Sequence, residues 1–243
     1  MPVFDAILRP LILWLARGFA RLVLRLRIEG VENVPKDEAL LVIGNHFSFF
    51  EPPLLGLFLP RYPRFLTATE SQENWFLRQL VRIYGQIPIW RGQVDRTAMR
   101  TVLDALAGGE WVGIFPEGGV DPAVQEKVAR GEQVTSTDGH MSRLNPVLIR
   151  ARPGAAFLAV QGQVRVLPVA FVGTEQIMGN LKRWRRTTVT MRVGQPFGPL
   201  VLDKSLRGQA KRAQLDGLGD EMMREIAALL PVENRGVYGG IGD

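Results

Sequence analysis

The sequence predicts an α/β fold in which a mixed, mostly parallel central sheet is flanked by helices. Short segments rich in Val, Ile and Leu alternate along the chain with segments of helical periodicity, and this alternation is typical of layered α/β domains. Polar and glycine residues also follow several of the apolar segments directly. In a parallel sheet such residues gather at the carboxyl ends of the strands, where α/β proteins bind their ligands.

Six short apolar segments are predicted to be strands, at residues 40–44, 64–68, 86–90, 111–116, 164–172 and 188–193. Helical periodicity predicts helices over residues 74–84, 96–107 and 154–161, and over residues 206–230 near the carboxyl end. Residues 119–150 are polar and rich in turn formers, so we expect an insertion or a mobile flap, for which the sequence pattern assigns no regular structure. We expect one catalytic domain over residues 28–230 and a glycine-rich, flexible tail over residues 231–243.

Residues 1–27 are predicted to form a basic amphipathic helical segment. Its charge-free run from Pro10 to Ala16 is much shorter than the roughly 20 residues that a membrane-spanning helix needs. Arginines recur through the apolar stretch and no small-residue cleavage site follows it, which argues against a signal peptide. Two interpretations remain, a helix lying in the plane of a membrane surface or a soluble helix packed on the core. Both would use the apolar residues Leu11, Ile12, Trp14, Leu15, Phe19, Leu22 and Val23.

The chain is cationic and has no cysteine. Lys and Arg number 30 against 24 Asp and Glu, and the resulting charge of +6 favours nucleic acid, a phosphorylated substrate or an acidic lipid surface as partner. The lack of cysteine excludes disulfides, thiolate metal sites and a catalytic thiol. The two histidines, His46 and His140, lie far apart, so neither a metal nor another cofactor is expected, and His140 is interpreted as a solvated residue.

The most informative segment is residues 44–51, Gly-Asn-His-Phe-Ser-Phe-Phe-Glu. It places His46 where a predicted strand ends, and an imidazole titrates close enough to neutral pH to act as a general base. A turn into the helix-like segment that follows would bring the Glu51 carboxylate back to the ring, giving a base and its orienting group. The alternative is structural, because Ser48 and Glu51 have the spacing of a helix capping box and His46 would then simply end a strand.

Two further strand ends carry charged residues. One is Arg91, which is followed by glycine, and a guanidinium suits a phosphate because it binds the oxygens in bidentate fashion. The other is the segment of residues 114–119, Ile-Phe-Pro-Glu-Gly-Gly, which runs from an apolar strand into a turn at Glu117 and Gly118. Taken singly, each has an ordinary interpretation as an exposed arginine or a solvated turn glutamate.

Taken in order, and with Val-Leu-Pro-Val-Ala at residues 166–170 as a fourth, these segments resemble the four blocks of the glycerolipid acyltransferase family. That family includes the lysophosphatidic acid acyltransferases, and the resemblance covers about residues 30–200. It implies that His46 takes a proton from an acceptor hydroxyl while Glu51 orients the imidazole. The hydroxyl would attack a thioester carbonyl directly, without an acyl-enzyme.

The resemblance also implies a set of substrate-binding residues. Arg91 would bind the phosphate of the acceptor, Glu117 and Gly118 would shape the acceptor site, and Pro168 would help to form the wall of the acyl-donor site. Asn45, which precedes the histidine in the family pattern, is placed with them.

Two departures from the family pattern bear on the acceptor. Glu51 stands where the family usually has aspartate, and Gly119-Val120 stands where many members have Thr-Arg, whose arginine also serves the phosphate. Arg150 or Arg152, beyond the polar insertion, would supply the missing charge.

The expected function is transfer of a fatty acyl group from acyl-CoA or acyl-carrier protein to lysophosphatidic acid, giving phosphatidic acid in phospholipid synthesis. The expected location is the cytoplasmic face of a membrane, with peripheral or monotopic attachment through the N-terminal helix. The alternatives are another lysophospholipid or hydroxyl acceptor, or a non-catalytic basic membrane-binding protein. A nucleic-acid partner is disfavoured because the arginines are scattered and no known recognition motif occurs. A serine hydrolase is disfavoured because no Gly-x-Ser-x-Gly segment is present.

Overall fold

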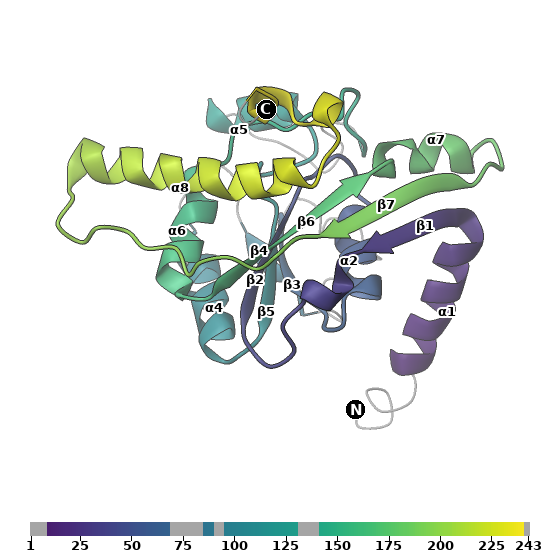
Figure 1. The fold of residues 1–243 in the computed structure, drawn as a ribbon, viewed down its shortest axis with the longest axis horizontal. Helices are drawn as coiled ribbons and strands as arrows, with labels where there is room; N and C mark the ends of the chain where they lie inside the picture. Colours follow the sequence, from purple (N-terminus) through teal and green to yellow (C-terminus); the bar gives the residue numbers. More distant parts are fainter. Residues whose placement is uncertain (1–8, 69–84, 90–94, 131–140, 241–243) are drawn as a thin grey trace.

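The computed structural model describes residues 9–68, 85–89, 95–130 and 141–240, and Figure 1 shows a central sheet with helices on both faces. The described strands are β1 (Leu24–Glu29), β2 (Leu40–Gly44), β3 (Arg64–Ala68), β4 (Ile87–Ile89), β5 (Trp111–Ile114), β6 (Arg165–Val172) and β7 (Thr187–Val193). The described helices are α1 (Arg9–Val23), α2 (Glu51–Phe58), α4 (Arg96–Ala107), α5 (Pro122–Ala129), α6 (Pro153–Gly162), α7 (Ile177–Leu181) and α8 (Gly208–Ala228).

The sheet has the order β1-β7-β6-β2-β5-β3-β4, and all of its described neighbours are parallel except β6 and β7. The prediction of a mixed, mostly parallel sheet flanked by helices is therefore confirmed. Strand β2 lies between β5 and β6, with Ile43 level with Ile114 on one side and Pro168 on the other. Because β7 and β1 run against β6, both begin at the edge of the sheet where β2, β5 and β6 end. We call this the carboxyl edge.

Two hydrophobic layers enclose the sheet. One lies under α4, α6 and α8 and includes Val102, Ala156 and Met222. The other lies on the α2 side and includes Leu55. Strand β6 contributes alternate residues to the two layers. Val166 and Ala170 lie in the first layer, and Leu167, Val169 and Phe171 lie in the second. Burial on both faces explains why the central strands form continuous apolar runs in the sequence.

Most predicted elements occur close to their predicted bounds. Strands β2 and β3 and helix α4 have the predicted limits, and β5, β6, β7 and α6 differ by one or two residues at an end. Strand β4 covers residues 87–89 of the predicted 86–90, of which residue 90 lies outside the described residues. The predicted helix at residues 74–84 also lies outside them.

The N-terminal segment differs from the prediction at its carboxyl end. Helix α1 ends at Val23, and the next six residues form β1, which pairs in parallel with β7. The reason is that the pattern of exposure changes after Val23 from that of a helix to the two-residue alternation of a strand. Leu24 is buried, and the exposed residues Arg25, Arg27 and Glu29 occupy alternate positions. The domain boundary expected after residue 27 is therefore wrong, since it would cut this strand.

The polar segment and the tail are more ordered than expected. Within the segment, residues 122–129 form helix α5, to which the sequence pattern assigns no regular structure. Beyond α8, two short 3-10 helices (Val232–Asn234 and Gly236–Tyr238) pack back onto the domain. The Tyr238 ring is buried and its hydroxyl donates to Asp220 Oδ1 of α8 at 2.8 Å. Through residue 240 the chain is therefore not a loose extension.

Candidate active site

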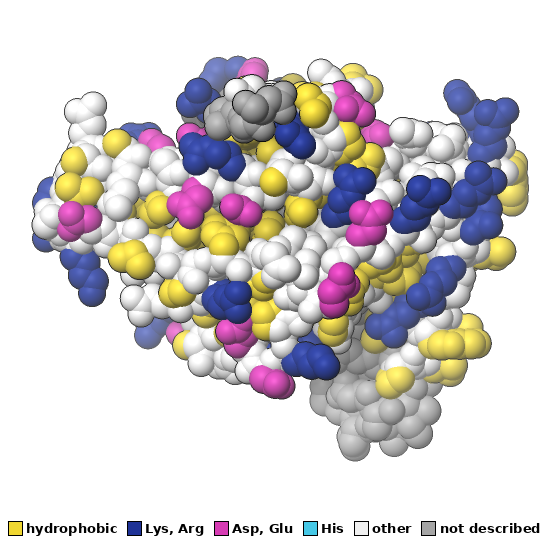
Figure 2. Space-filling model, viewed as in Figure 1, with side chains coloured by type: hydrophobic (Ala, Val, Ile, Leu, Met, Phe, Trp, Pro, Cys, Tyr) yellow, Lys and Arg dark blue, Asp and Glu magenta, His cyan; other side chains and the backbone are white. Residues whose placement is uncertain are grey.

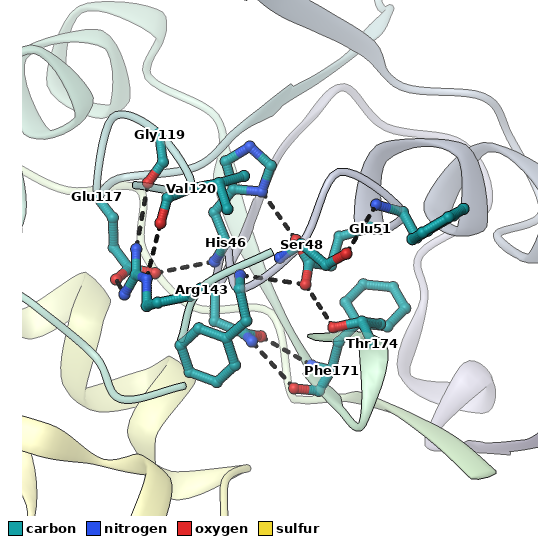
Figure 3. Close-up of polar contacts among 12 residues, drawn as sticks. His46, Ser48, Glu51, Glu117, Gly119, Val120, Arg143, Phe171 and Thr174 are labelled. Carbon is teal, nitrogen blue, oxygen red and sulfur yellow. Dashed lines mark hydrogen bonds and ion pairs between the residues drawn. The ribbon is translucent and has the colours of Figure 1, made fainter. Parts of the chain in front are cut away.

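The polar residues of the site lie just beyond three neighbouring strands at the carboxyl edge (Figure 3). His46 follows β2, Glu117 follows β5 and Thr174 follows β6. Glu51, the first residue of α2, lies between His46 and Thr174 in Figure 3. The rule that ligands bind beyond the carboxyl ends of parallel strands therefore identifies this edge as the candidate active site.

Glu51 is a fully buried carboxylate that accepts four hydrogen bonds. Oε2 accepts from His46 Nδ1 at 2.8 Å and from the Ser48 backbone N–H at 3.0 Å. Oε1 accepts from the Phe47 backbone N–H at 3.1 Å and from Thr174 Oγ1 at 2.6 Å. These contacts fix the position of the carboxylate and, through it, the orientation of the imidazole.

The turn between β2 and α2 explains how a glutamate five residues after the histidine reaches its ring. The helix begins at Glu51 itself, and the two prolines that follow occupy first-turn positions where no backbone donor is needed. The Glu51 carboxylate also accepts from the Ser48 N–H, but the N-cap of the helix is Phe50 and no side chain caps it, so Ser48 and Glu51 do not form the capping box that their spacing suggested. The structure therefore favours the interpretation in which Glu51 orients the imidazole over the interpretation as a capping box.

The second nitrogen of the His46 ring is available for chemistry. Because a carboxylate only accepts hydrogen bonds, we assign the proton to Nδ1, which leaves a lone pair on Nε2. No group within the described ranges bonds Nε2, and the side chain is 15% exposed. The ring stacks on Phe115 with a centroid distance of 4.0 Å, and Phe115 stacks on Phe65 at 5.7 Å. This aromatic column holds the imidazole plane while Glu51 fixes its rotation.

Burial and hydrogen bonding act in opposite directions on the Glu51 carboxyl. Burial raises its pKa above the ordinary value, whereas the hydrogen bond and charge of His46 and the hydrogen bonds from Thr174 and Ser48 lower it. The donors are therefore what stabilises the charged form of a carboxylate that water does not reach. A charged Glu51 in turn stabilises an imidazolium at His46.

Asn45 and Glu117, both expected to bind substrate, are fully buried and hold the histidine loop in place. The Asn45 amide donates to the Phe171 carbonyl at 3.0 Å and accepts from the Phe171 N–H at 2.8 Å, which ties the loop to β6. Glu117 Oε1 accepts from the His46 backbone N–H at 2.9 Å, which ties the loop to the end of β5. We therefore assign both side chains positioning roles.

Arg143 was not among the residues singled out in the sequence, yet it completes this arrangement. Its Nη1 lies 2.5 Å from Glu117 Oε2 and the two side chains are 3% and 0% exposed. Further bonds run to the carbonyl oxygens of Val120, Val147 and Gly119 at 2.9, 2.7 and 3.2 Å. The buried charge of Glu117 is therefore paired by an arginine from the polar segment, as Figure 3 shows.

The segment that contains Arg143 lies directly against the histidine loop. The Arg143 N–H donates to the Phe47 carbonyl at 2.7 Å, and the Phe49 N–H donates to the Met141 carbonyl at 2.8 Å. Between these bonds, Ser48 Oγ and Ser142 Oγ are 3.1 Å apart. Residues 141–143 therefore form a second support for the loop that carries the base.

The remaining predicted residues differ in their placement. Gly118 has φ +85°, a conformation that favours glycine, and closes the turn through its N–H to the Phe115 carbonyl at 2.9 Å. The Arg152 N–H donates to the Pro116 carbonyl at 2.8 Å, so this arginine lies beside the same turn. Arg91 lies outside the described residues.

Pro168, expected to help form the wall of the acyl-donor site, is level with Ile43 of the neighbouring strand β2. It is buried in the middle of β6, with its carbonyl accepting from the Gly194 N–H at 2.9 Å. A side chain added at Gly194 would meet Pro168 Cγ on one side and Leu229 on the other. Pro168 thus belongs to the packed layer by the end of α8, and we assign it a structural role.

Thr174 and Arg143 are the residues that sequence reasoning missed. Thr174 had a detectable signal, because it follows the glycine that ends a strand predicted to lie in the same parallel sheet. Arg143 had none, since it is one of many arginines and lies in a polar segment whose path the sequence pattern does not reveal.

Replacing Thr174 by alanine is expected to destabilise the fold by about 1.5–3 kcal/mol, because it removes a donor from a buried charged group. It should also reduce catalytic turnover about tenfold, as the carboxylate loses one of the contacts that fix it. Loss of this hydrogen bond raises the Glu51 pKa further, so activity should fall at a higher pH as the solution is acidified. Urea titrations and pH–rate profiles measure these effects. Thr174→Ser retains the hydroxyl, and equal behaviour of the two variants would contradict the assigned role.

The site and fold together define a class of enzyme. A histidine base oriented by a buried carboxylate, at the carboxyl edge of a mixed α/β sheet, can deprotonate a hydroxyl for attack on an acyl group. Residues 25–172, more than half of the chain, match the model of the family described as Acyltransferase. The chain belongs to this acyltransferase family.

Several curated proteins are similar to this chain. Uncharacterized proteins of Mycobacterium tuberculosis and Mycobacterium bovis are 28% identical over 182 residues, which are 71% of this chain and 43% of theirs. The chain thus spans less than half the length of these relatives. The 1-acyl-sn-glycerol-3-phosphate acyltransferase of Bacillus subtilis is 22% identical over 172 residues, which are 70% of this chain and 73% of that protein.

The crystal structure of the 1-acyl-sn-glycerophosphate acyltransferase PlsC from Thermotoga maritima has a similar fold. The TM-score is 0.55 at 22% identity, and the match covers 85% of this chain and 73% of that one.

Proposed function

We propose that the protein transfers a fatty acyl group from acyl-CoA or acyl-carrier protein to the free hydroxyl of lysophosphatidic acid, giving phosphatidic acid. The observation that supports this most directly is the 2.8 Å contact between His46 Nδ1 and the buried Glu51 carboxylate, with Nε2 unbonded by any described group. The named relative from Bacillus subtilis and the fold of PlsC support the same substrate class.

The proposed reaction needs no covalent enzyme intermediate. His46 Nε2 accepts the proton of the acceptor hydroxyl as the hydroxyl oxygen attacks the thioester carbonyl carbon. Glu51 stabilises the imidazolium that results. The tetrahedral intermediate then breaks its C–S bond, and the imidazolium returns its proton to the leaving thiolate. The products are an ester and a free thiol, and His46 is ready for another cycle.

Anionic substrate is proposed to bind beside the Pro116–Gly118 turn. Arg91 remains the proposed phosphate ligand from the sequence, and Arg152 is placed next to the turn by its backbone bond to Pro116. Both guanidinium groups would interact with the phosphate of the acceptor while its hydroxyl faces His46.

The protein is further proposed to work at a membrane surface, on its cytoplasmic side. Helix α1 packs on α2 through Arg17, whose Nε donates to the Leu57 carbonyl at 2.6 Å, and through Arg21, whose guanidinium lies 5.4 Å from the centre of the Phe58 ring. The opposite side of the helix exposes large apolar side chains, 46–70% accessible, which are Leu11, Ile12, Trp14, Leu15, Phe19 and Leu22. Such a face suits an interfacial helix. Among the described helices, none has the length and hydropathy to cross a bilayer.

Another lysophospholipid or hydroxyl acceptor is the second candidate. Gly119-Val120 stands where many family members have Thr-Arg, and the carbonyl oxygens of both residues accept hydrogen bonds from Arg143. Without the arginine that many family members carry at this position, other charged residues would select the acceptor, and its head group would then differ.

Transfer of a radiolabelled acyl chain from acyl-CoA or acyl-carrier protein to several acceptors in liposomes tests the proposal. We expect the highest kcat/KM with lysophosphatidic acid, and an increase of about tenfold or more in KM for this acceptor in Arg91→Ala, since a charge-assisted contact is removed. The Glu51→Asp variant should retain activity at a reduced rate, because it keeps the carboxylate. Preference for an uncharged acceptor, or inactivity with both donors on all acceptors, would contradict the proposal.

A further inference from the structure

A tryptophan in a strongly basic turn is the most exposed large apolar side chain in the described part of the chain. Trp184 is 97% exposed and lies between α7 and β7 in the run Lys182-Arg183-Trp184-Arg185-Arg186. All five of these residues are exposed. Within the described residues, no carboxylate pairs with Lys182, Arg183 or Arg185. We call residues 182–186 the Trp184 turn.

The exposure of Trp184 is built into the backbone. Its N–H donates to the Leu181 carbonyl at 3.0 Å and the next N–H, of Arg185, donates to the Asn180 carbonyl at 2.9 Å. The Asn180 side chain in turn bonds Thr187 Oγ1 at 3.1 Å. Trp184 itself has φ +55°, which a bulky residue rarely adopts. The turn therefore projects the indole into solvent in a conformation that the surrounding hydrogen bonds hold.

The Trp184 turn is attached to the end of α1. Arg186 Nη2 donates to the carbonyl oxygens of Arg21 and Leu24 at 2.6 and 2.7 Å. A hollow beside this contact is lined by Arg21, Arg25, Arg27 and Arg186. Figure 2 shows Lys and Arg side chains gathered over this end of the molecule, with hydrophobic side chains beside them. One continuous basic surface thus joins the Trp184 turn to the apolar face of α1.

The same surface lies at the end of the sheet that carries the active site. Strands β7 and β1 begin at the carboxyl edge, and Leu24 and Thr187 are paired there. The Trp184 turn precedes β7 and α1 precedes β1. The Trp184 turn and the carboxyl end of α1 therefore flank the edge beyond which His46 lies.

We propose that the Trp184 turn is a second membrane contact, which inserts its indole into the interface of an anionic bilayer and so turns the carboxyl edge toward the lipids. This rests on the proposed function and specifies its partner as an anionic lipid surface. Tryptophan is favoured at the level of the lipid head groups, and unpaired Lys and Arg are attracted by acidic lipids. A single apolar anchor gives weak attachment, and a second one combined with a basic patch makes it stable.

A site-specific fluorescence experiment tests the insertion. The sequence has no cysteine, so Trp184→Cys in the full chain can be labelled at one position with an environment-sensitive fluorophore. Leu15→Cys on α1 is the positive comparison, and Val201→Cys, 73% exposed on a loop before α8, is the negative one. Phosphatidylcholine vesicles that contain phosphatidylglycerol should raise and blue-shift the emission at position 184 and at position 15 but leave position 201 unchanged.

Vesicle sedimentation tests the contribution of charge. The variant Lys182→Gln/Arg183→Gln/Arg185→Gln should bind the anionic vesicles about fivefold more weakly for each charge removed, or about 100-fold in all. Raising the salt concentration should weaken the binding of the wild type to the anionic vesicles by a similar factor, because salt screens the same charges. A matched control, Lys204→Gln/Lys211→Gln/Arg212→Gln, removes three exposed charges around the start of α8 and should bind nearly as the wild type. Circular dichroism melts verify that each variant is folded.

The outcomes separate this inference from the proposed function. A silent fluorophore at position 184 with a responsive one at position 15, or equal loss of binding in the two charge variants, would overturn the inference even if acyl transfer occurs. A response to an acidic carrier protein and none to vesicles would assign the turn to a protein surface and would also overturn it. Vesicle binding that requires the turn in a protein without acyl transfer would support the inference and contradict the proposed function.

Discussion

Replacing His46 by alanine is expected to lower the turnover of acyl transfer about 10³-fold, within the range that a general base contributes. The reason is that no other described group within the site combines a free lone pair with a buried carboxylate behind it. The KM values for the donor and the acceptor should change little, because the ring contributes to the chemical step and not to uniform binding. Steady-state kinetics with a radiolabelled acyl donor measure this.

His140→Ala is the matched control for the His46 substitution, because it removes the only other histidine. We expect it to retain wild-type turnover. The thermal unfolding of both variants should be measured, since loss of the imidazole leaves Glu51 with one donor fewer and lowers stability. A His46→Ala protein that is folded and turns over within tenfold of the wild type would exclude the general-base role.

Much of the fold could be predicted because the spacing of apolar residues in the sequence indicates both the type of each element and which of its faces are buried. Residues 40–44 are a short, continuous apolar run, which is why a strand was predicted there, and the run is buried on both faces because β2 lies inside the sheet. The base and its orienting acid were also found, because His46 and Glu51 are close in sequence and a turn is enough to join them. The short spacing between His46 and Glu51 and their position after a predicted strand were therefore enough to identify the base and its orienting acid.

The rest of the site could not be predicted because it depends on contacts between distant segments. Thr174 reaches Glu51 only because β6 is the neighbour of β2, a pairing of residues more than 120 positions apart. Arg143 reaches Glu117 only because residues 141–143 run beside the histidine loop. Strand β1 was missed for a related reason, since its alternation becomes informative only when β7 is known to be its partner.

These long-range contacts also explain why family residues expected to touch substrate are buried. The Asn45 side chain, from the histidine loop itself, bonds the backbone of β6, and the Glu117 side chain, beyond the end of β5, bonds the backbone of the loop. The loop is thereby clamped on both sides, and the base keeps its position without help from a ligand. Preorganisation of this kind lowers the cost of reaching the reactive geometry.

Arg143→Ala is expected to destabilise the protein by about 3–5 kcal/mol, because it leaves the buried carboxylate of Glu117 without its partner. For a domain of this size the loss corresponds to a fall in melting temperature of about 10 °C. Turnover should fall as well, since the same carboxylate accepts from the His46 N–H at 2.9 Å and its shift would move the base. Calorimetry and kinetics at a temperature where the variant is folded give both values.

A double substitution separates the pairing of charge from a direct role in binding substrate. Glu117→Gln/Arg143→Met removes both buried charges while the amide oxygen can still accept from the His46 N–H. We expect most of the lost stability and part of the lost turnover to return, because replacing a buried ion pair by uncharged groups is often close to neutral. If Arg143 instead bound the phosphate of the acceptor, Arg143→Ala would raise KM at unchanged stability and the double variant would not recover. The structure argues for the first outcome, since bonds inside the protein use four of the five N–H donors of Arg143 and its side chain is only 3% exposed.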